Sequence, residues 1–194
     1  MRPRAIIALL TLLIMPCIAE PGSIMAGPYK VSFDIGSTRD YYDVALWTPI
    51  EIESAIGDKG TEYAVEITSK LNQNDSIIIK ISYFKDNQTN YTAYDLKETS
   101  DLGYGKYPEF FENYSSEVCT IDGTTGVVIS LMALSMNNTG NKYRMYQANY
   151  LPIFDPTHTY VMVVSLYPWN EGTLQLLKTI HVEKINSTSL VGPI

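Results

Sequence analysis

The chain has very few of the side chains on which enzymes and metal sites most often depend. Its 194 residues include 2 cysteines and 2 histidines, and it has no Gly-x-Ser-x-Gly elbow, phosphate-binding loop or dinucleotide fingerprint. A zinc site needs three or four clustered ligands, and neither His158 nor His181 has a histidine four residues away or a cysteine beside it. We therefore predict no catalytic residue, no cofactor, no metal site and a role other than that of an enzyme.

Two weaker signals of chemistry have simpler interpretations. Cys119 would be a candidate nucleophile if His158 or His181 lay beside it, but a single cysteine in a strand is far more often a small buried hydrophobe. Glu51 and Glu53 could face the same side of a strand, as the acids of glycosidases do. On an acidic chain, exposed carboxylates explain that pair more simply.

Basic residues are also scarce. Lys and Arg number 14 against 21 Asp and Glu, which gives a formal net charge of −7. Such a surface repels nucleic acid and anionic lipid and keeps an exported protein soluble. The composition therefore excludes nucleic acid as an expected partner.

The N-terminal apolar run is too short to span a bilayer. Two arginines precede a mostly apolar run at residues 5–13, and small residues follow at Ala19 and Ala26, which is typical of a secretory signal peptide. We assign residues 1–26 to this leader, with cleavage after Ala19 or after Ala26 left open. The predicted location is extracellular, at the cell wall or a sheath, with no transmembrane anchor after cleavage.

Cleavage leaves the mature chain without a cysteine pair. Cys17 lies in the leader, and Met15 and Pro16 replace the small residues that a bacterial-type lipoprotein signal needs before it. With Cys119 alone, no disulfide forms within one mature chain. Packing, or association between copies, must therefore stabilise the single domain predicted over residues 27–185; residues 186–194 are expected to be a flexible tail.

Acceptor triplets for N-glycosylation, Asn-x-Ser/Thr, are abundant. They cluster in predicted loops and tails, which indicates a glycosylated surface protein, although Asn, Ser and Thr also gather in turns for conformational reasons. The acceptor residues are Asn74, Asn87, Asn90, Asn113, Asn137 and Asn186.

Most of the mature sequence is predicted to form short strands. Apolar and polar residues alternate over residues 29–35, and further strands are expected at 42–47, 63–68 and 76–84, the last two as a hairpin. Residues 86–118 are the least regular, with a short helix predicted to start at Pro108.

The C-terminal half has sharper signals. Asp122-Gly123 predicts a tight turn, and strands over 125–136, 142–151 and 159–167 are close enough in sequence to form an antiparallel meander. A helix is expected from Glu171 through Ile180, with His181 near its C-terminal end. Its apolar face would cover the meander.

This order of elements resembles the PsbP/Mog1-type sandwich over roughly residues 60–185, including the predicted closing helix at residues 176–182. The resemblance implies an α+β fold in which helices cover an antiparallel sheet with a C-terminal meander. The opening Gly27-Pro-Tyr-Lys-Val-Ser-Phe-Asp34, behind a signal peptide, is similar to small exported surface and sheath proteins of methanogenic archaea.

Three segments have the composition of strands that stack between chains. Each has seven residues of high β-propensity, no proline and at most one charge. They are Ile77–Tyr83, Gly126–Met132 and Tyr160–Leu166. Taken together with export, they favour a non-enzymatic structural protein of the cell envelope that self-assembles through β-strands into a sheath or surface layer, in an amyloid-like manner.

The alternative function is a PsbP/Mog1-like extracytoplasmic binding module. The chain contains 15 tyrosines, several of them within residues 91–114, and tyrosine provides a flat apolar ring with a polar tip. Such a module would dock on a membrane complex, with an envelope protein as partner, or bind a small ligand. Tyrosine is also common on half-buried strands, so the residues leave both interpretations open.

Overall fold

The computed structural model describes residues 22–54, 57–71, 75–86, 91–134, 142–166 and 171–185. Its helices are α1 (Ala93–Tyr104) and α2 (Glu171–Thr179), and a 3₁₀ helix, η1, covers Gly36–Tyr41. The strands are β1 (Gly22–Ala26), β2 (Tyr29–Phe33), β3 (Tyr42–Leu46), β4 (Ile50–Glu53), β5 (Lys59–Ser69), β6 (Ser76–Phe84), β7 (Phe111–Ile121), β8 (Thr124–Leu134), β9 (Lys142–Tyr150), β10 (Thr159–Leu166) and β11 (His181–Lys184).

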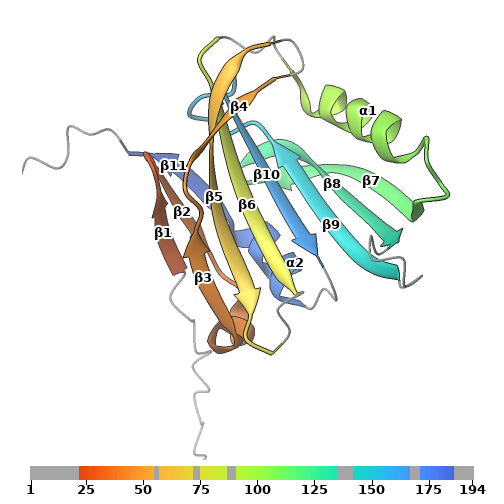
Figure 1. Ribbon diagram of the computed structural model, residues 1–194, viewed down its shortest axis with the longest axis horizontal. Helices are drawn as coiled ribbons and strands as arrows, with labels where there is room; N and C mark the ends of the chain where they lie inside the picture. Colours follow the sequence, from red (N-terminus) through yellow and green to blue (C-terminus); the bar gives the residue numbers. More distant parts are fainter. Residues whose placement is uncertain are drawn as a thin grey trace, which may run out of the picture.

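The strands form two antiparallel sheets (Figure 1). The small sheet has the order β1-β2-β11. The large sheet has eight strands in the order β3-β5-β6-β10-β9-β8-β7, and β4 pairs with β5 beyond the end of β3. One end of the large sheet therefore consists of β3 and β4, and the other of β7.

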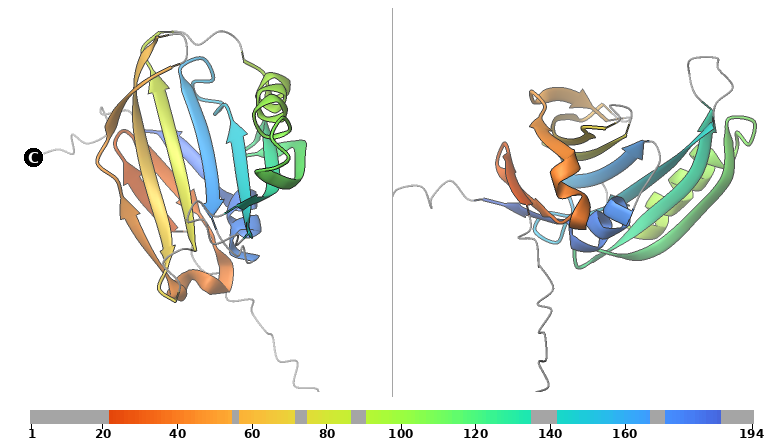
Figure 2. Two further views of the ribbon diagram at one scale, coloured as in Figure 1. Left: turned by 45° about the vertical axis from the view of Figure 1, so that its right-hand side comes forward. Right: turned by 90° about the horizontal axis from the view of Figure 1, so that it is seen from below.

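The predicted α+β sandwich covered by helices is wrong. The fold is mostly β, with two antiparallel sheets and two helices among the described residues. α1 packs mainly on β7, β8 and β9, whereas the small sheet and α2 share a core with β5, β6 and β10 on the opposite face. The two views of Figure 2 show α1 confined to the β7 end. A second sheet takes the place of the expected helical cover.

Alternation along the central strands supplies both cores. In β8, Val127 and Ile129 point toward α1, whereas Val128 packs against the core under the small sheet. The register of β9 continues the same division, because Ala148 lies opposite Val128 and Gln147 lies opposite Ile129. β8 and β9 therefore contribute side chains to both cores at this point.

Several predicted pairings are confirmed. β5 and β6 form the expected hairpin partners, with Val65 opposite Ile79. β8, β9 and β10 form the expected antiparallel meander, and residues 122–123 turn between β7 and β8. Asp122 there has φ 50° and Gly123 has φ 71°, the left-handed conformation that Asp and Gly tolerate best in such turns.

The closing helix is shorter than predicted. α2 ends at Thr179, and His181–Lys184 forms β11, which pairs with β2. Asp122 fixes this strand, because its Oδ2 accepts a hydrogen bond from the Val182 N–H at 3.0 Å and its Oδ1 lies 2.6 Å from His181 Nδ1. The expected helical position of His181 is therefore wrong, since strand pairing replaces the last helical turn.

The irregular region contains the helix that the sequence prediction missed. α1 begins after Thr92, whose side chain accepts a hydrogen bond from the Asp95 N–H while the Asp95 carboxylate accepts one from the Thr92 N–H. This reciprocal pair is a capping box, a signal present in the sequence. The helix predicted from Pro108 is absent: residues 108–110 form a turn, and β7 starts at Phe111.

β1 lies inside the segment assigned to the leader. Its five residues pair in register with β2, and Ala26 is buried in the core that the two sheets share. Residues 1–21, which include the alternative cleavage site at Ala19, are outside the described residues. Cleavage after Ala26 would remove an edge strand of the small sheet, whereas cleavage after Ala19 retains it.

If the leader is removed, we therefore expect cleavage after Ala19, so that the processed chain begins at Glu20. N-terminal sequencing should read Glu-Pro-Gly-Ser, and a chain shortened to start at Gly27 should unfold at a lower temperature because it lacks β1. An exported chain that starts at Gly27 and has the thermal stability of the longer form would contradict the place of β1 in the fold.

Candidate functional site

The most unusual surface is the edge of the large sheet formed by β3 and β4. Four large apolar side chains lie exposed along it, an arrangement that marks association sites when it occurs on an unprotected strand. Their exposed fractions are Val44 44%, Leu46 49%, Trp47 39% and Ile50 49%. We call these four residues the edge patch.

Two residues of the edge patch, Val44 and Leu46, are exposed because the small sheet is narrower than the large one. Val44 lies opposite Ile67 and Leu46 lies opposite Val65, and both partners are fully buried. Directly opposed residues point to the same face, so Val44 and Leu46 project into the space between the sheets. β1 is the outermost strand of the small sheet, and it leaves these two side chains partly uncovered.

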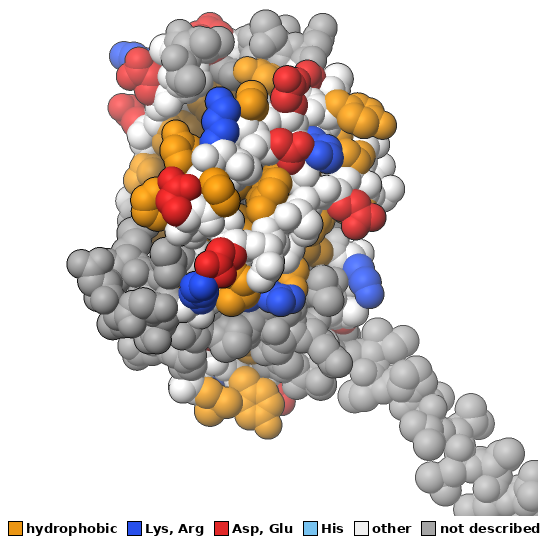
Figure 3. Space-filling view, turned by 90° about the vertical axis from the view of Figure 1, so that its right-hand side faces the viewer, with side chains coloured by type: hydrophobic (Ala, Val, Ile, Leu, Met, Phe, Trp, Pro, Cys, Tyr) orange, Lys and Arg blue, Asp and Glu red, His pale blue; other side chains and the backbone are white. Residues whose placement is uncertain are grey.

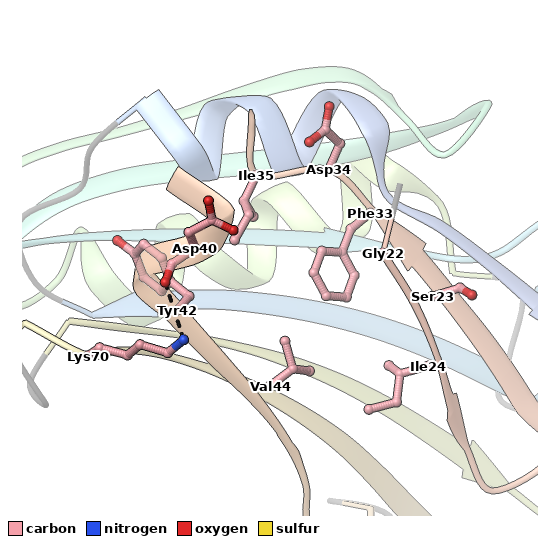
Figure 4. A pocket seen from close by; sticks show the side chains of 10 residues that line it. All are labelled: Gly22, Ser23, Ile24, Phe33, Asp34, Ile35, Asp40, Tyr42, Val44 and Lys70. Carbon is pink, nitrogen blue, oxygen red and sulfur yellow. Dashed lines mark hydrogen bonds between the residues drawn. The ribbon is translucent and has the colours of Figure 1, made fainter. Parts of the chain in front are cut away.

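A pocket of about 350 Å³ opens between the two edge strands. Figure 4 shows Ile24 of β1, Phe33 of β2 and Val44 of β3 pointing toward one another within it, while the carboxylate of Asp34 points away. Lys70 lies at the rim and donates a hydrogen bond to the Asp40 carbonyl at 3.2 Å. The pocket therefore has an apolar interior and a polar rim.

The Trp47 side chain lies on the opposite face of the same edge. Its Nε1–H donates to Glu66 at 2.8 Å, and the Lys80 ammonium lies 5.8 Å from the centre of its ring. Lys80 also donates to Glu62 at 3.0 Å. These contacts fix the indole while a large part of it remains accessible.

The three segments predicted to stack between chains lie elsewhere. Ile77–Tyr83, Gly126–Met132 and Tyr160–Leu166 fall in β6, β8 and β10, each of which has a neighbouring strand on both sides. Their backbone groups are engaged within the chain. In the folded protein, strand pairing with another molecule must therefore use an end of a sheet.

The opposite end of the large sheet is protected. β7 has a bulge between Glu112 and Ser115, where Asn113 is exposed with φ 51°. Bulges and charged residues hinder pairing at sheet edges. Asn113 was predicted in a loop, and the structure places it in a strand. The other acceptors, Asn74, Asn87, Asn90, Asn137 and Asn186, and the tail at residues 186–194, lie outside the described residues.

The tyrosine-rich segment forms a second candidate surface around α1. Tyr91 and Tyr94 are exposed near the start of the helix, and Tyr107 and Phe110 are exposed in the turn that follows it. In Figure 3, apolar side chains on this side of the molecule lie between acidic and basic ones. A pocket of about 250 Å³, lined partly by Tyr91 and Tyr160, lies between α1 and the sheet.

Asp101 ties α1 to β7. Its carboxylate accepts hydrogen bonds from Tyr114 and Ser116, each at 2.6 Å, and from Lys97 at 2.6 Å. These three donors, Lys97 first, lower the pKa of Asp101 to about 2 from 3.8. The ionised carboxylate is therefore the form that holds the helix in place.

This network predicts a distinct acid dependence. Because the pKa of Asp101 is lower in the folded chain than in the unfolded chain, its stabilising contribution is complete above about pH 4 and is lost as the pH falls toward about 2. We expect Asp101→Asn to lower the Tm at pH 7 by about 2–4 °C and to flatten the fall of Tm between these pH values.

Thermal melts monitored by circular dichroism across this pH range would test the expectation. Asp86→Asn, which removes an exposed carboxylate after the end of β6, is the matched control and should leave the acid dependence unchanged. Equal pH profiles for Asp101→Asn and the unsubstituted chain would contradict the assigned role.

The remaining candidate side chains take part in separate contacts. Cys119 lies in β7, packed against the core, and burial together with Glu117 raises the pKa of its thiol. His158 Nδ1 lies 2.9 Å from Asp155 Oδ1, whereas His181 contacts Asp122. In the described residues no hydrogen bond joins either histidine to Cys119. Glu51 and Glu53 are exposed on β4.

Within the described ranges, no group of three or more His, Cys, Asp or Glu side chains is arranged to hold a metal ion. No helix there is both long enough and apolar enough to cross a membrane.

Comparison with known proteins identified no relative of this chain. No protein-family model matches the chain, and searches of curated proteins and of solved structures found no match. The function must therefore be inferred from the molecule itself.

Proposed function

We propose that this protein is a non-enzymatic, exported structural component of the cell envelope that associates with copies of itself through the edge formed by β3 and β4. The observation that supports this most strongly is the edge patch, an apolar surface on an unprotected strand. A strand added there would gain backbone hydrogen bonds and cover Val44 and Leu46. Association by strand pairing was expected from the sequence, but at different segments.

The surface chemistry agrees with a structural role outside the cell. The leader-like segment supports export, and Asn113, an exposed acceptor on β7, is placed where a glycan would shield the opposite edge of the large sheet. A glycan there would limit association to the β3 edge. The assembled form would present its acidic residues to solvent, as expected of a protein on a hydrated surface.

The alternative is a binding module that docks on an envelope protein through the exposed aromatic residues around α1. Tyr91, Tyr94, Tyr107 and Phe110 support it, because aromatic residues are enriched in protein interfaces. On this side of the molecule, acidic and basic side chains lie among the apolar ones (Figure 3), whereas the β3 edge also offers backbone hydrogen bonds to a second strand. We therefore prefer self-association.

Charge substitutions at the edge test the proposal. Val44→Lys and Leu46→Lys each place an ammonium group where apolar side chains would be covered, and each should weaken self-association about tenfold or more. Ile153→Lys is the matched control, because Ile153 is also highly exposed but lies in a turn. Sedimentation velocity over a concentration series, with circular dichroism to confirm folding, would measure the effect.

The unsubstituted protein and Ile153→Lys should show a mass that rises with concentration. An unsubstituted protein that stays monomeric at its highest soluble concentration would contradict the proposal. Association that survives both edge substitutions but is lost in Tyr94→Lys would instead assign the interaction to the α1 surface.

A further inference from the structure

The direction of the backbone groups along β3 determines how a second strand would pair with it. The Trp47 N–H donates to the Ala64 carbonyl at 3.1 Å, and the Lys70 N–H donates to the Tyr41 carbonyl at 2.8 Å. Hydrogen-bonded pairs alternate along an antiparallel ladder. Residues 41, 43, 45 and 47 therefore direct their backbone groups toward β5, whereas Val44 and Leu46 direct theirs outward.

We infer that two copies of this chain pair β3 with β3 in antiparallel orientation about a two-fold axis at Ala45, which makes a closed dimer. This inference rests on the proposed self-association and specifies its geometry. Val44 of each copy would pair with Leu46 of the other, so the outward backbone groups of both residues form hydrogen bonds. Ala45 would face its own copy in a non-hydrogen-bonded pair, where a small side chain suits the close approach of about 4.5 Å between Cα atoms.

The side chains of the edge are self-complementary in this register. Val44 and Leu46 project into the space between the sheets, so Leu46 of the second copy would lie beside Val44 at the mouth of the pocket lined by Ile24 and Phe33. An apolar side chain would thus lie against the apolar interior of this pocket. On the other face, Ala45 and its copy leave room for the two exposed indoles of Trp47.

The charges also favour this axis. Asp43 is the only charged residue of β3, and Lys70 lies 3.3 Å from its carboxylate. An axis at Ala45 places Asp43 opposite Trp47 of the second copy, whereas an axis at Asp43 would place two carboxylates opposite each other. Directly opposed like charges destabilise strand pairs. An axis at Ala45 therefore keeps the two Asp43 carboxylates from opposing each other.

A closed dimer follows because the two ends of the large sheet differ. An open filament would require β3 of one copy to pair with β7 of the next, a head-to-tail contact. β7 has the bulge at residues 112–115, the exposed acceptor Asn113 and the exposed Glu117. These features oppose strand addition, so pairing of β3 with itself is the combination that remains for the large sheet.

Disulfide trapping tests the register. In the exported protein carrying Cys119→Ala, Ala45→Cys places two thiols opposite each other at a distance that a disulfide bridges. Mild oxidation should convert most of the chain to a covalent dimer on a non-reducing gel. Asp43→Cys is the matched control, because its two copies would be four residues apart along the ladder, about 13 Å, and should remain uncrosslinked.

The outcomes separate the two proposals. Crosslinking of Asp43→Cys as efficient as that of Ala45→Cys would overturn the two-fold axis at Ala45. Failure of Ala45→Cys to crosslink, while sedimentation still shows association, would overturn the geometry but leave the proposed self-association standing. Failure to crosslink in a protein that sediments as a monomer would overturn both. Covalent dimer from Ala45→Cys alone supports the inference.

Discussion

The width of the large sheet is the constraint on which the rest of the structure depends. A sheet with apolar residues on both faces must cover both, and here the covering elements differ: α1 covers one face at the β7 end, and the small sheet with α2 covers the other. The small sheet has three strands against eight. Val44 and Leu46 consequently face the same side as the core residues of β5, but the small sheet covers them only in part.

The difference in width between the two sheets determines which strands are available for association. The most β-prone segments occupy the centre of the large sheet, where each pairs on both sides, so their composition serves the core of the folded chain. The exposed edge, in contrast, has one charged residue and no proline within β3. High β-propensity in the sequence therefore indicated stable interior strands, whereas the accessible strand was recognisable only from its position in the sheet.

The sequence predicted the strands of the β5–β6 hairpin and of the meander. Apolar and polar residues alternate regularly along these strands, and this alternation and the turn residues between strands are local signals. The prediction failed where one pattern fits two structures. Ile180 and Val182, for example, fit either a helix or a strand, and the structure places Val182 in β11. α1 was missed because its buried residues, Ala93 and Ser100, are small. The edge patch was not predictable, because its exposure depends on how far the second sheet extends.

Hydrogen exchange at individual amides of β3 tests the central claim most directly. If copies pair through this edge, the outward amides of Val44 and Leu46 should exchange rapidly in dilute protein and become slower as concentration rises, because pairing protects them. The amide of Ile79, within the doubly paired β6, should remain protected at every concentration. Exchange of Val44 and Leu46 that does not change over a range in which the protein associates would contradict association at this edge.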